Sequence, residues 1–192
     1  MHFHIIIDHP WDQSFNHTVL TAFTEGLAKN LHTFDVLDLN KEGFNPIISE
    51  EELAIYSSGG ILDPKVKEYQ KRLLAAQQLV LIFPIWWNVM PARLKGWMDK
   101  VLLPGFAFTT DQVPAPLLNH IQQASIFTTT GTPDKYHREE YNNALEGVLC
   151  KGTLEFCGVQ QVNWYNFGET GFAPRKKHED WIEFVLDYSG GL

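Results

Sequence analysis

Two adjacent tryptophans, Trp86 and Trp87, stand between two different sequence patterns. The apolar run 79–83 before them does not alternate, which predicts a strand buried on both faces, and Pro84 is expected to end its ladder. Helical spacing begins after Pro91. In an open parallel sheet, a loop between a strand and a helix lies at the carboxyl edge, where ligands bind. The indoles are therefore either core aromatics that cap the sheet or a platform for a flat aromatic cofactor, whose polar edge the loop amides would reach.

A polar loop follows the apolar run Phe3 to Ile7. Within it, Ser14 and Asn16 are both good N-cap residues, and helical spacing follows them. A loop that leads from a strand into a helix presents free backbone N–H groups and the positive end of the helix dipole, an arrangement that suits phosphate. Ser and Asn also occur in such loops as caps alone, so both interpretations stand at this point. No glycine-rich dinucleotide fingerprint and no P-loop is present, which excludes a Rossmann type of binding.

A third loop, Thr129-Thr130-Gly131, follows the apolar run 124–128. Small hydroxyl residues and a glycine at the carboxyl end of a strand let backbone amides approach a ligand closely. The three loops that follow the first, third and fourth predicted strands therefore carry the residues best suited to bind a ligand.

Metal and thiol chemistry find little support in the sequence. Cys150 and Cys157 are spaced neither as a CxxC redox pair nor as a zinc site, so two half-buried thiols are expected. The pair His2-x-His4 is not expected to bind a metal, and no HExxH motif is present. Glu139-Glu140 resembles the charges of a helix start rather than a catalytic carboxylate pair.

Length and composition limit the classes of protein that fit. The chain has 192 residues, 44% of them apolar, which predicts one globular domain spanning 1–192 with a sizeable core. The net charge of −8 argues against nucleic acid and anionic membrane surfaces as partners. No apolar run reaches the length of a membrane span, and no signal peptide is recognisable. A cytoplasmic protein is expected.

Strands and helices alternate along the chain, which predicts a doubly wound parallel sheet. Residues 50–63, acidic and then glycine-rich, are expected to be mobile. Pro64 is expected to open a helix with Val66, Tyr69 and Leu73 inward. The predicted strands are 3–7, 36–39, 79–83, 124–128 and 159–167, and the last two helices are predicted at 138–148 and 174–187.

The segment 83–108 resembles the flavin loop of the NAD(P)H:quinone oxidoreductases with a flavodoxin-like fold, the NAD(P)H dehydrogenase (quinone) and modulator of drug activity B type. The resemblance implies a three-layer sandwich with a five-stranded parallel sheet of order 2-1-3-4-5. It also implies a bound flavin whose ring lies against residues 84–88. The motifs that carry it are Phe83-Pro84-Ile85-Trp86-Trp87, Met90-Pro91-Ala92, Leu94-Lys95-Gly96-Trp97 and Gly105-Phe106-Ala107-Phe108.

The same resemblance implies a role for individual residues. His9 and the triplet Ser14-Phe15-Asn16 match the loop that contacts the flavin phosphates, the loop 129–131 would meet the pyrimidine edge, and Tyr136 would lie beside N1 and O2. Trp87, Phe106 and Phe108 would line the substrate pocket, with Phe108 reaching the pocket of a second subunit. The implied cofactor-binding residues are His9, Ser14, Phe15, Asn16, Pro84, Ile85, Trp86, Trp87, Asn88, Thr129, Thr130, Gly131 and Tyr136.

Two positions depart from the family pattern. Thr132 stands where the family often has a second glycine. Asn142 aligns with a histidine that relays a proton in the dimeric quinone reductases, and an amide cannot do this at neutral pH. Tyr136 is expected to stabilise the reduced flavin at N1, and His137 is our hypothesis for the replacement relay. These two residues are the predicted catalytic groups.

The predicted function is a flavin-dependent NAD(P)H:quinone oxidoreductase. Its mechanism is expected to be ping-pong, in which NAD(P)H reduces the flavin and leaves, and a quinone or similar flat acceptor then takes two electrons at the same place. FAD is favoured over FMN because the Ser-Phe-Asn loop resembles the FAD-binding members, and a homodimer without metal is expected. The alternatives are a regulatory flavoprotein ancillary to a potassium-efflux antiporter and a flavodoxin-type electron carrier.

Overall fold

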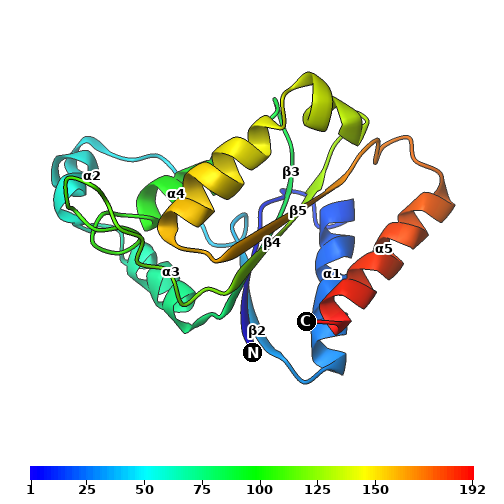
Figure 1. Cartoon of the computed structure of the whole chain (residues 1–192), viewed down its shortest axis with the longest axis horizontal. Coiled ribbons are helices and arrows are strands. Elements are labelled where there is room, and N and C mark those ends of the chain that lie inside the picture. The colour runs from blue at the N-terminus through cyan, green and yellow to red at the C-terminus, as the bar shows by residue number, and fades with distance from the viewer.

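Five parallel strands form one sheet in the order β2-β1-β3-β4-β5 (Figure 1). The computed structural model describes residues 1–192, and the sheet order confirms the predicted flavodoxin-like architecture. Each strand lies within a few residues of its predicted bounds. The strands are β1 (His2–Ile7), β2 (Thr33–Asp38), β3 (Gln78–Pro84), β4 (Gln123–Thr129) and β5 (Gln161–Phe167).

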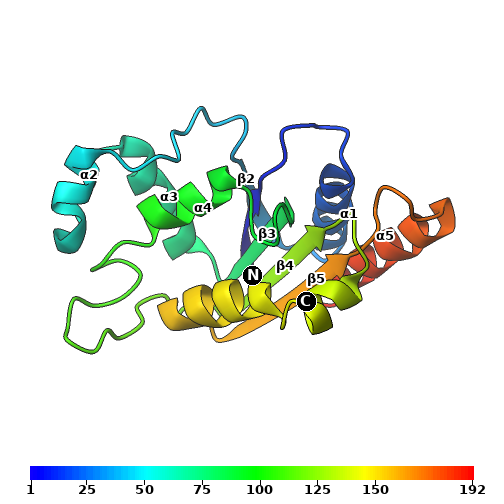
Figure 2. The ribbon, with the colours of Figure 1, turned by 90° about the horizontal axis from the view of Figure 1, so that it is seen from above.

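Helices cover both faces of this sheet, which is why its central strands are apolar without alternation. Every residue of β3 is buried, whereas the edge strands β2 and β5 are partly exposed. Helices α1 (Phe15–Lys29) and α5 (Arg175–Gly190) lie side by side on one face (Figures 1 and 2). The other face carries α3 (Pro64–Ala75), α4 (Ala92–Val101) and the π-helical segment η3 (Glu146–Glu155).

Each face of the sheet has its own hydrophobic core. Phe3, Phe23 and Phe127 lie in the core under α1 and α5, and Tyr69 and Trp97 lie in the larger core on the opposite face. The α1–α5 packing is close: a Cβ built on Gly26 would lie 1.8 Å from the Ser189 Oγ and 2.8 Å from the Leu186 carbonyl oxygen. Only glycine therefore lets the two helices approach this far.

The parallel register brings four strand ends to one edge. Ile7 pairs with Ile82, Pro84 with Thr129, and Thr129 with Phe167. Pro84 is the last residue of its strand, and the Ile85 N–H still donates to the Thr129 carbonyl at 2.9 Å. The loops after β1, β3, β4 and β5 consequently start next to one another.

Part of the segment expected to be mobile is helical. Residues Glu50–Ile55 form α2 and Tyr56–Ser58 form a short 3-10 turn, η1. Ser49 and Glu52 make a capping box at the start of α2, in which each side chain bonds the backbone N–H of the other. This pattern was readable in the sequence, so the prediction was wrong for residues 50–58.

The helix predicted at 138–148 is interrupted. A short π-type turn, η2 (Tyr136–Glu140), ends before Asn142 and Asn143, whose φ angles are 50° and 53°. Asparagine tolerates this left-handed region better than most residues, so the pair breaks the helix before η3 begins. Val148, the last residue of the predicted helix, is 57% exposed, and its neighbour Leu149 is fully buried.

Candidate active site

A cleft of about 400 Å³ lies at the carboxyl edge of the sheet. It joins the loop after β1, the start of α1, the end of β4, the loop after β5 and the start of α5. The lining residues are His9, Trp11, Gln13, Ser14, Phe15, Asn16, Thr18, Thr129, Thr170, Gly171 and His178. Four predicted cofactor-binding residues from the first loop, together with Thr129, are thus brought together.

The start of α1 presents hydrogen-bond donors to this cleft. Ser14 is the N-cap, with extended backbone, and its Oγ accepts a long hydrogen bond from the His17 N–H at 3.4 Å. The first amides of a helix lack partners inside the helix and lie at the positive end of its dipole. The structure thus confirms a helix start at this loop, and anion binding there stays a prediction.

Asn16 has a buried donor without a partner. Its side chain is 2% exposed, and its Oδ1 accepts a hydrogen bond from the Thr129 hydroxyl at 2.9 Å. The Nδ2 atom is buried and bonds nothing in the protein. A buried polar group left in this state costs about 1–3 kcal/mol. Since Asn16 lines the cleft, an acceptor on a bound ligand would satisfy it.

His9 is a neutral donor in the same cleft. Its Nδ1 accepts the Trp11 N–H at 3.1 Å, so the hydrogen of the neutral ring is on Nε2. Burial lowers the pKa of His9, which favours this neutral form. The His9 ring centroid is 6.2 Å from that of Trp86, and this contact joins the loop after β1 to the loop after β3.

The two indoles of the second loop are exposed rather than packed in the core. Trp86 is 46% exposed and Trp87 is 95% exposed. Trp86 and Val89 exchange two backbone hydrogen bonds, of 3.0 and 3.2 Å. Trp87 and Asn88 between them have φ angles of 52° and 65°, which gives a tight turn of type I′. The interpretation of these residues as core aromatics is therefore wrong.

Asp8 fixes the position of this loop, a role that the sequence analysis missed. Its carboxylate is 3% exposed. Oδ2 accepts the Leu94 N–H in the first turn of α4 at 2.8 Å, and Oδ1 accepts from the Asn40 side chain at 2.8 Å. Pro91 is the N-cap of α4 and has no side-chain bond to offer, so Asp8 supplies the cap from another strand. Burial is the largest influence on Asp8 and raises its pKa.

The loop after β4 holds the predicted catalytic pair at its far end. Tyr136 is 39% exposed, and His137 is 5% exposed. The Nε2 of His137 lies 3.2 Å from the Thr132 Oγ1, and burial lowers the pKa of His137. Asn142 is exposed. The departure from glycine at residue 132 therefore supplies a hydroxyl partner for the buried imidazole.

Several predicted site residues lie outside the lining of the cleft. These include the ring-binding segment 84–88, Thr130, Gly131 and Tyr136. Gly131 is exposed, and a Cβ built on it would meet nothing within 4 Å. Thr130 is buried, and its hydroxyl donates to the Thr132 carbonyl at 2.8 Å. Thr130 therefore supports the loop rather than facing the cleft with its side chain.

Phe106 and Phe108 lie on a different surface within one chain. Phe108 lines a hollow of about 200 Å³ with Met90, Met98 and Phe156, and Phe106 is half-buried against the same core. The Phe108 and Phe156 ring centroids are 5.4 Å apart. Neither phenylalanine lines the cleft at His9 and Asn16.

The loop after β5 contributes residues that the sequence analysis did not assign. Thr170 donates from Oγ1 to the Thr130 carbonyl at 3.1 Å. His178 also lines the cleft, and its Nε2 donates to the Thr170 carbonyl at 3.0 Å. Only the topology could have indicated this residue, because β5 ends at the same edge of the sheet as the other parallel strands and brings the following loop and helix there.

Comparisons with known proteins agree with the geometry. A family model described as "flavodoxin-like fold" matches residues 1–188. An uncharacterised NAD(P)H oxidoreductase of Haemophilus influenzae is 30% identical over 183 residues, which cover 94% of this chain and 90% of that protein.

Two quinone reductases are also similar to this chain. NAD(P)H dehydrogenase [quinone] 1 of Rattus norvegicus is 30% identical over 190 residues, covering 86% of this chain and 69% of that protein. The structure of an NAD(P)H:quinone oxidoreductase from Methanothermobacter marburgensis superposes with a TM-score of 0.90 at 28% identity. It covers 99% of this chain and 96% of that one. No helix in the structure of this chain is both long and apolar enough to span a membrane.

Proposed function

The chain belongs to the family of proteins with the flavodoxin-like fold, and from this premise we propose that it is a flavin-dependent NAD(P)H:quinone oxidoreductase. The similarity to NAD(P)H oxidoreductases and quinone reductases over most of the chain supports the activity. The flavin would accept electrons from NAD(P)H and pass two of them to a quinone.

The observation that carries the proposal is the unpartnered Asn16 Nδ2 in the cleft. The Nε2–H of His9 and the first amides of α1, at Phe15 and Asn16, are further donors at the same end of the cleft. Phosphate oxygens are acceptors and carry the charge that a helix start favours. These residues would therefore hold the phosphate of a flavin nucleotide.

The ring of the flavin would lie against residues 84–88. Trp86 and Trp87 leave their indoles exposed, Trp86 lies beside His9, and the type I′ turn holds the backbone in a fixed shape. The loop 129–131 would meet the pyrimidine edge with its backbone amides. An open face over such a ring could admit NAD(P)H and the quinone in turn, which supports a ping-pong order.

Tyr136 and His137 would manage the proton at the reduced ring. His137 is buried and bonded to Thr132, so it can exchange a proton along that bond without facing water. Asn142 cannot do so. We expect His137→Ala to lower the rate of flavin reduction and to change its pH profile. An unchanged rate and profile would remove His137 from the mechanism.

The cofactor is tested first by the absorption spectrum of the purified protein and the mass of the extracted chromophore. Asn16→Asp keeps the acceptor for Thr129 and replaces the free donor with a carboxylate, which would repel phosphate. We expect at least a hundredfold loss of flavin nucleotide affinity, because a charge-assisted hydrogen bond becomes a like-charge contact. Cofactor-free protein that refuses both FAD and FMN would contradict the proposal.

Three further properties are proposed: the identity of the flavin, a homodimer and a cytoplasmic localisation. FAD is favoured over FMN, and the same extraction decides between them. A homodimer is expected to cover the hollow at Phe108, where Val148 and Phe156 are 57% and 44% exposed. Sedimentation of wild type and Phe108→Ala tests the dimer, and cell fractionation tests cytoplasmic localisation.

A further inference from the structure

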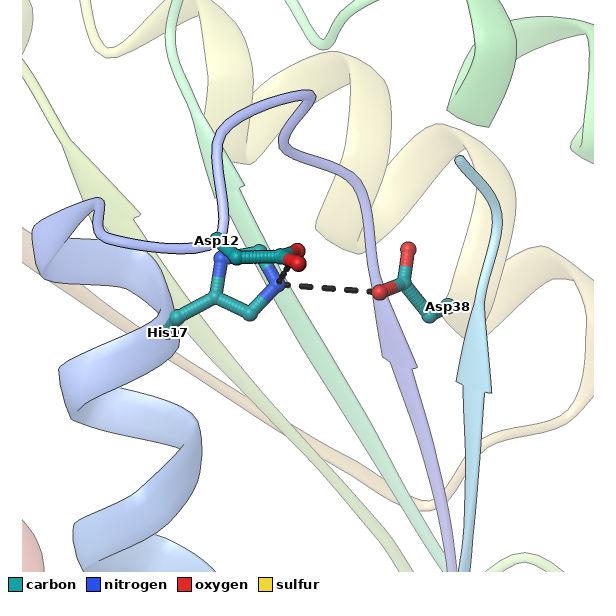
Figure 3. Close-up of side chains that lie close together, drawn as sticks. All are labelled: Asp12, His17 and Asp38. Atoms are coloured by element: carbon teal, nitrogen blue, oxygen red, sulfur yellow. Dashed lines mark ion pairs between the residues drawn. The ribbon is translucent and has the colours of Figure 1, made fainter. Parts of the chain in front are cut away.

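Behind the Ser14 hydroxyl lies a cluster of charged side chains that the proposed function does not use. His17, in the first turn of α1, places its Nδ1 3.0 Å from the Ser14 Oγ. Its Nε2 faces the Asp12 Oδ1 at 3.5 Å and the Asp38 Oδ2 at 3.6 Å (Figure 3). The three come from the loop after β1, from α1 and from the end of β2. One imidazole thus connects the N-cap of α1 to two carboxylates.

A lysine shares the same two carboxylates. The Lys41 Nζ is 3.0 Å from the Asp12 Oδ1 and 3.2 Å from the Asp38 Oδ2. These are residue types that could ligate a metal ion, but the ammonium group already occupies the same oxygens. With a neutral His17 the four side chains carry a net charge of −1, and with an imidazolium they are neutral. The charge balance therefore accommodates a second proton on His17.

The direction of the Ser14 hydrogen depends on that proton. The Nε2 atom is buried and makes no hydrogen bond, but the two carboxylate oxygens 3.5 and 3.6 Å away favour a hydrogen on it in the neutral and in the charged ring. In the neutral ring Nδ1 is then an acceptor, so the single hydrogen of the Ser14 hydroxyl is donated to His17. In the imidazolium, Nδ1 donates to the Ser14 Oγ, and the hydroxyl hydrogen is free to point elsewhere.

The free hydrogen would point to the cleft. Ser14 is 4% exposed and lines the cleft beside Asn16, whose side chain is 98% buried and has an unpartnered Nδ2. An acceptor bound there is served by one donor in the neutral state of His17 and by two in the charged state. A negative ligand is also attracted to the imidazolium itself.

We propose that His17 is a positioning residue that takes up a proton when a phosphate-bearing ligand binds at Ser14, and thereby turns the Ser14 hydroxyl from His17 to the phosphate. The proposal rests on the proposed function for the identity of the ligand, a flavin nucleotide. It adds to that function a linkage between proton binding and cofactor binding.

The other groups that face His17 do not compete for this role. His9 is the nearest imidazole, with ring centroids 6.3 Å apart. Its Nδ1 already accepts the Trp11 N–H, so protonation there would break a bond, and burial lowers its pKa. The hydrogen bond between Asp12 and Lys41 lowers the pKa of the Asp12 carboxyl and raises the pKa of the Lys41 ammonium, so both keep their charges. Glu25, further along α1, lines a surface hollow together with His17.

The test is calorimetric titration of flavin-free protein with FMN and with FAD in buffers of different ionisation enthalpy. Wild type is expected to take up protons as the flavin nucleotide binds at neutral pH, which appears as a dependence of the observed binding enthalpy on the ionisation enthalpy of the buffer. His17→Gln is expected to take up none, and Ser14→Ala is expected to take up less than wild type, because the attraction between the phosphate and the imidazolium remains. His120→Gln, on an exposed histidine that precedes β4 at the other edge of the sheet, is the matched control and keeps the uptake.

Riboflavin separates the phosphate from the ring. We expect His17→Gln to weaken FMN binding about tenfold near pH 7, the loss of one charge-assisted hydrogen bond, and to leave riboflavin binding within about twofold of wild type. Equal losses for FMN and riboflavin would show a merely structural role and overturn the proposal. Uptake that persists in His17→Gln, or that is absent from wild type at every pH, would also overturn it.

Failure of the proposed function would look different. If none of the flavins binds, the oxidoreductase proposal falls, and inorganic phosphate becomes the probe for His17 in the same buffers. Proton uptake with phosphate in wild type and its loss in His17→Gln would still support the positioning role. Thermal unfolding of each variant in the absence of ligand verifies that the comparison is made between folded proteins.

Discussion

Asp8 joins three parts of the molecule through one carboxylate. It ends β1, caps the first turn of α4 at Leu94 and holds the Asn40 side chain beyond β2. Both bonds are 2.8 Å long, and the group is almost fully buried. A single side chain therefore sets the distance between the cleft and the turn that carries Trp86 and Trp87.

We expect Asp8→Ala to lower the free energy of unfolding by about 2 kcal/mol, since it leaves the buried Leu94 N–H and the partly buried Asn40 side chain without their acceptor. Asp8→Asn keeps an acceptor for Leu94 and removes a buried charge, so its effect is expected within about 1 kcal/mol of wild type. Denaturant unfolding of both variants checks this. Equal losses would mean that the charge of Asp8, not its hydrogen bonds, holds the loop.

The difference in stability between wild type and Asp8→Asn is expected to depend on pH. Burial raises the pKa of the folded Asp8 carboxyl above its unfolded value of about 3.9. The folded state then binds this proton more tightly than the unfolded state does. The stabilisation that the proton gives to the folded state is therefore complete below the unfolded pKa and is lost as the pH rises through the folded pKa. Wild type should gain stability relative to Asp8→Asn as the pH is lowered from about 7 towards about 4.

Residue types and their places in the loops after strands led to Ser14, Asn16 and Thr129. Short polar side chains in such loops suit a ligand or a helix cap. Asp8, which directly follows β1, and His178 were not found in this way. Their partners Leu94 and Thr170 meet them only after the chain has folded, and nothing local in the sequence distinguishes them from surface residues.

The turn between β3 and α4 is an element held in an unfavourable backbone conformation. Trp87 has a left-handed φ angle with its side chain in solvent, which costs an L-residue about 1 kcal/mol. Such strain is expected to persist where function requires it. Binding of the flavin ring against this turn is the function that would require it.

Trp87→Gly should therefore stabilise the ligand-free protein by up to about 1 kcal/mol and weaken flavin binding about tenfold through the lost ring contact. Leu31→Gly is the matched control, because Leu31 has a φ of 59° and is 91% exposed at the end of α1. It should gain similar stability and bind flavin as wild type does. Flavin titration and thermal unfolding of both variants separate the two effects.

Helix α4 carries two lysines in contrasting ion pairs. Lys100 is 6% exposed and bonds the Glu52 carboxylate at 2.7 Å, whereas Lys95 is exposed and pairs with Asp99 on its own helix. Lys100→Ala should cost about 3 kcal/mol because it leaves a largely buried carboxylate unpaired. Lys95→Ala should cost under about 0.5 kcal/mol. Urea unfolding that gave equal losses would contradict the burial argument.

The elements differ in how well the sequence predicted them. The central strands were clear, since a fully covered strand leaves an unbroken apolar run. Helix α2 was missed although its capping box Ser49–Glu52 was present, because acidic and glycine-rich residues around it suggested mobility. The break at Asn142 and Asn143 was missed because the flanking apolar spacing continues through it at nearly helical intervals.

At the scale of the whole molecule, the reactivity of the two thiols measures how well the larger hydrophobic core excludes solvent. Cys150 and Cys157 are 2% and 3% exposed, and burial raises their pKa values to about 12 and about 11. Only the thiolate reacts readily. Labelling by a disulfide reagent at about pH 8 should be slower than in the unfolded chain by at least about a thousandfold. Rapid labelling of one thiol would reveal local opening of η3.

The overall architecture was predictable only in part from the residues themselves. Alternating strands and helices predicted a parallel doubly wound sheet, because parallel strands need crossover connections. The strand order 2-1-3-4-5 came from the resemblance of segment 83–108 to a known family. Periodicity cannot give it, since all three central strands have the same apolar pattern.

The packing of α1 against α5 bears on how the chain folds as it leaves the ribosome. Strand β1 is made first, yet Phe3 must wait for its β3 neighbour at Gln78, and the Gly26 contact with Ser189 forms only when the last helix has emerged. Until then the side of α1 that packs against α5 has no cover. Nascent chains should therefore stay dependent on chaperones until synthesis is nearly finished.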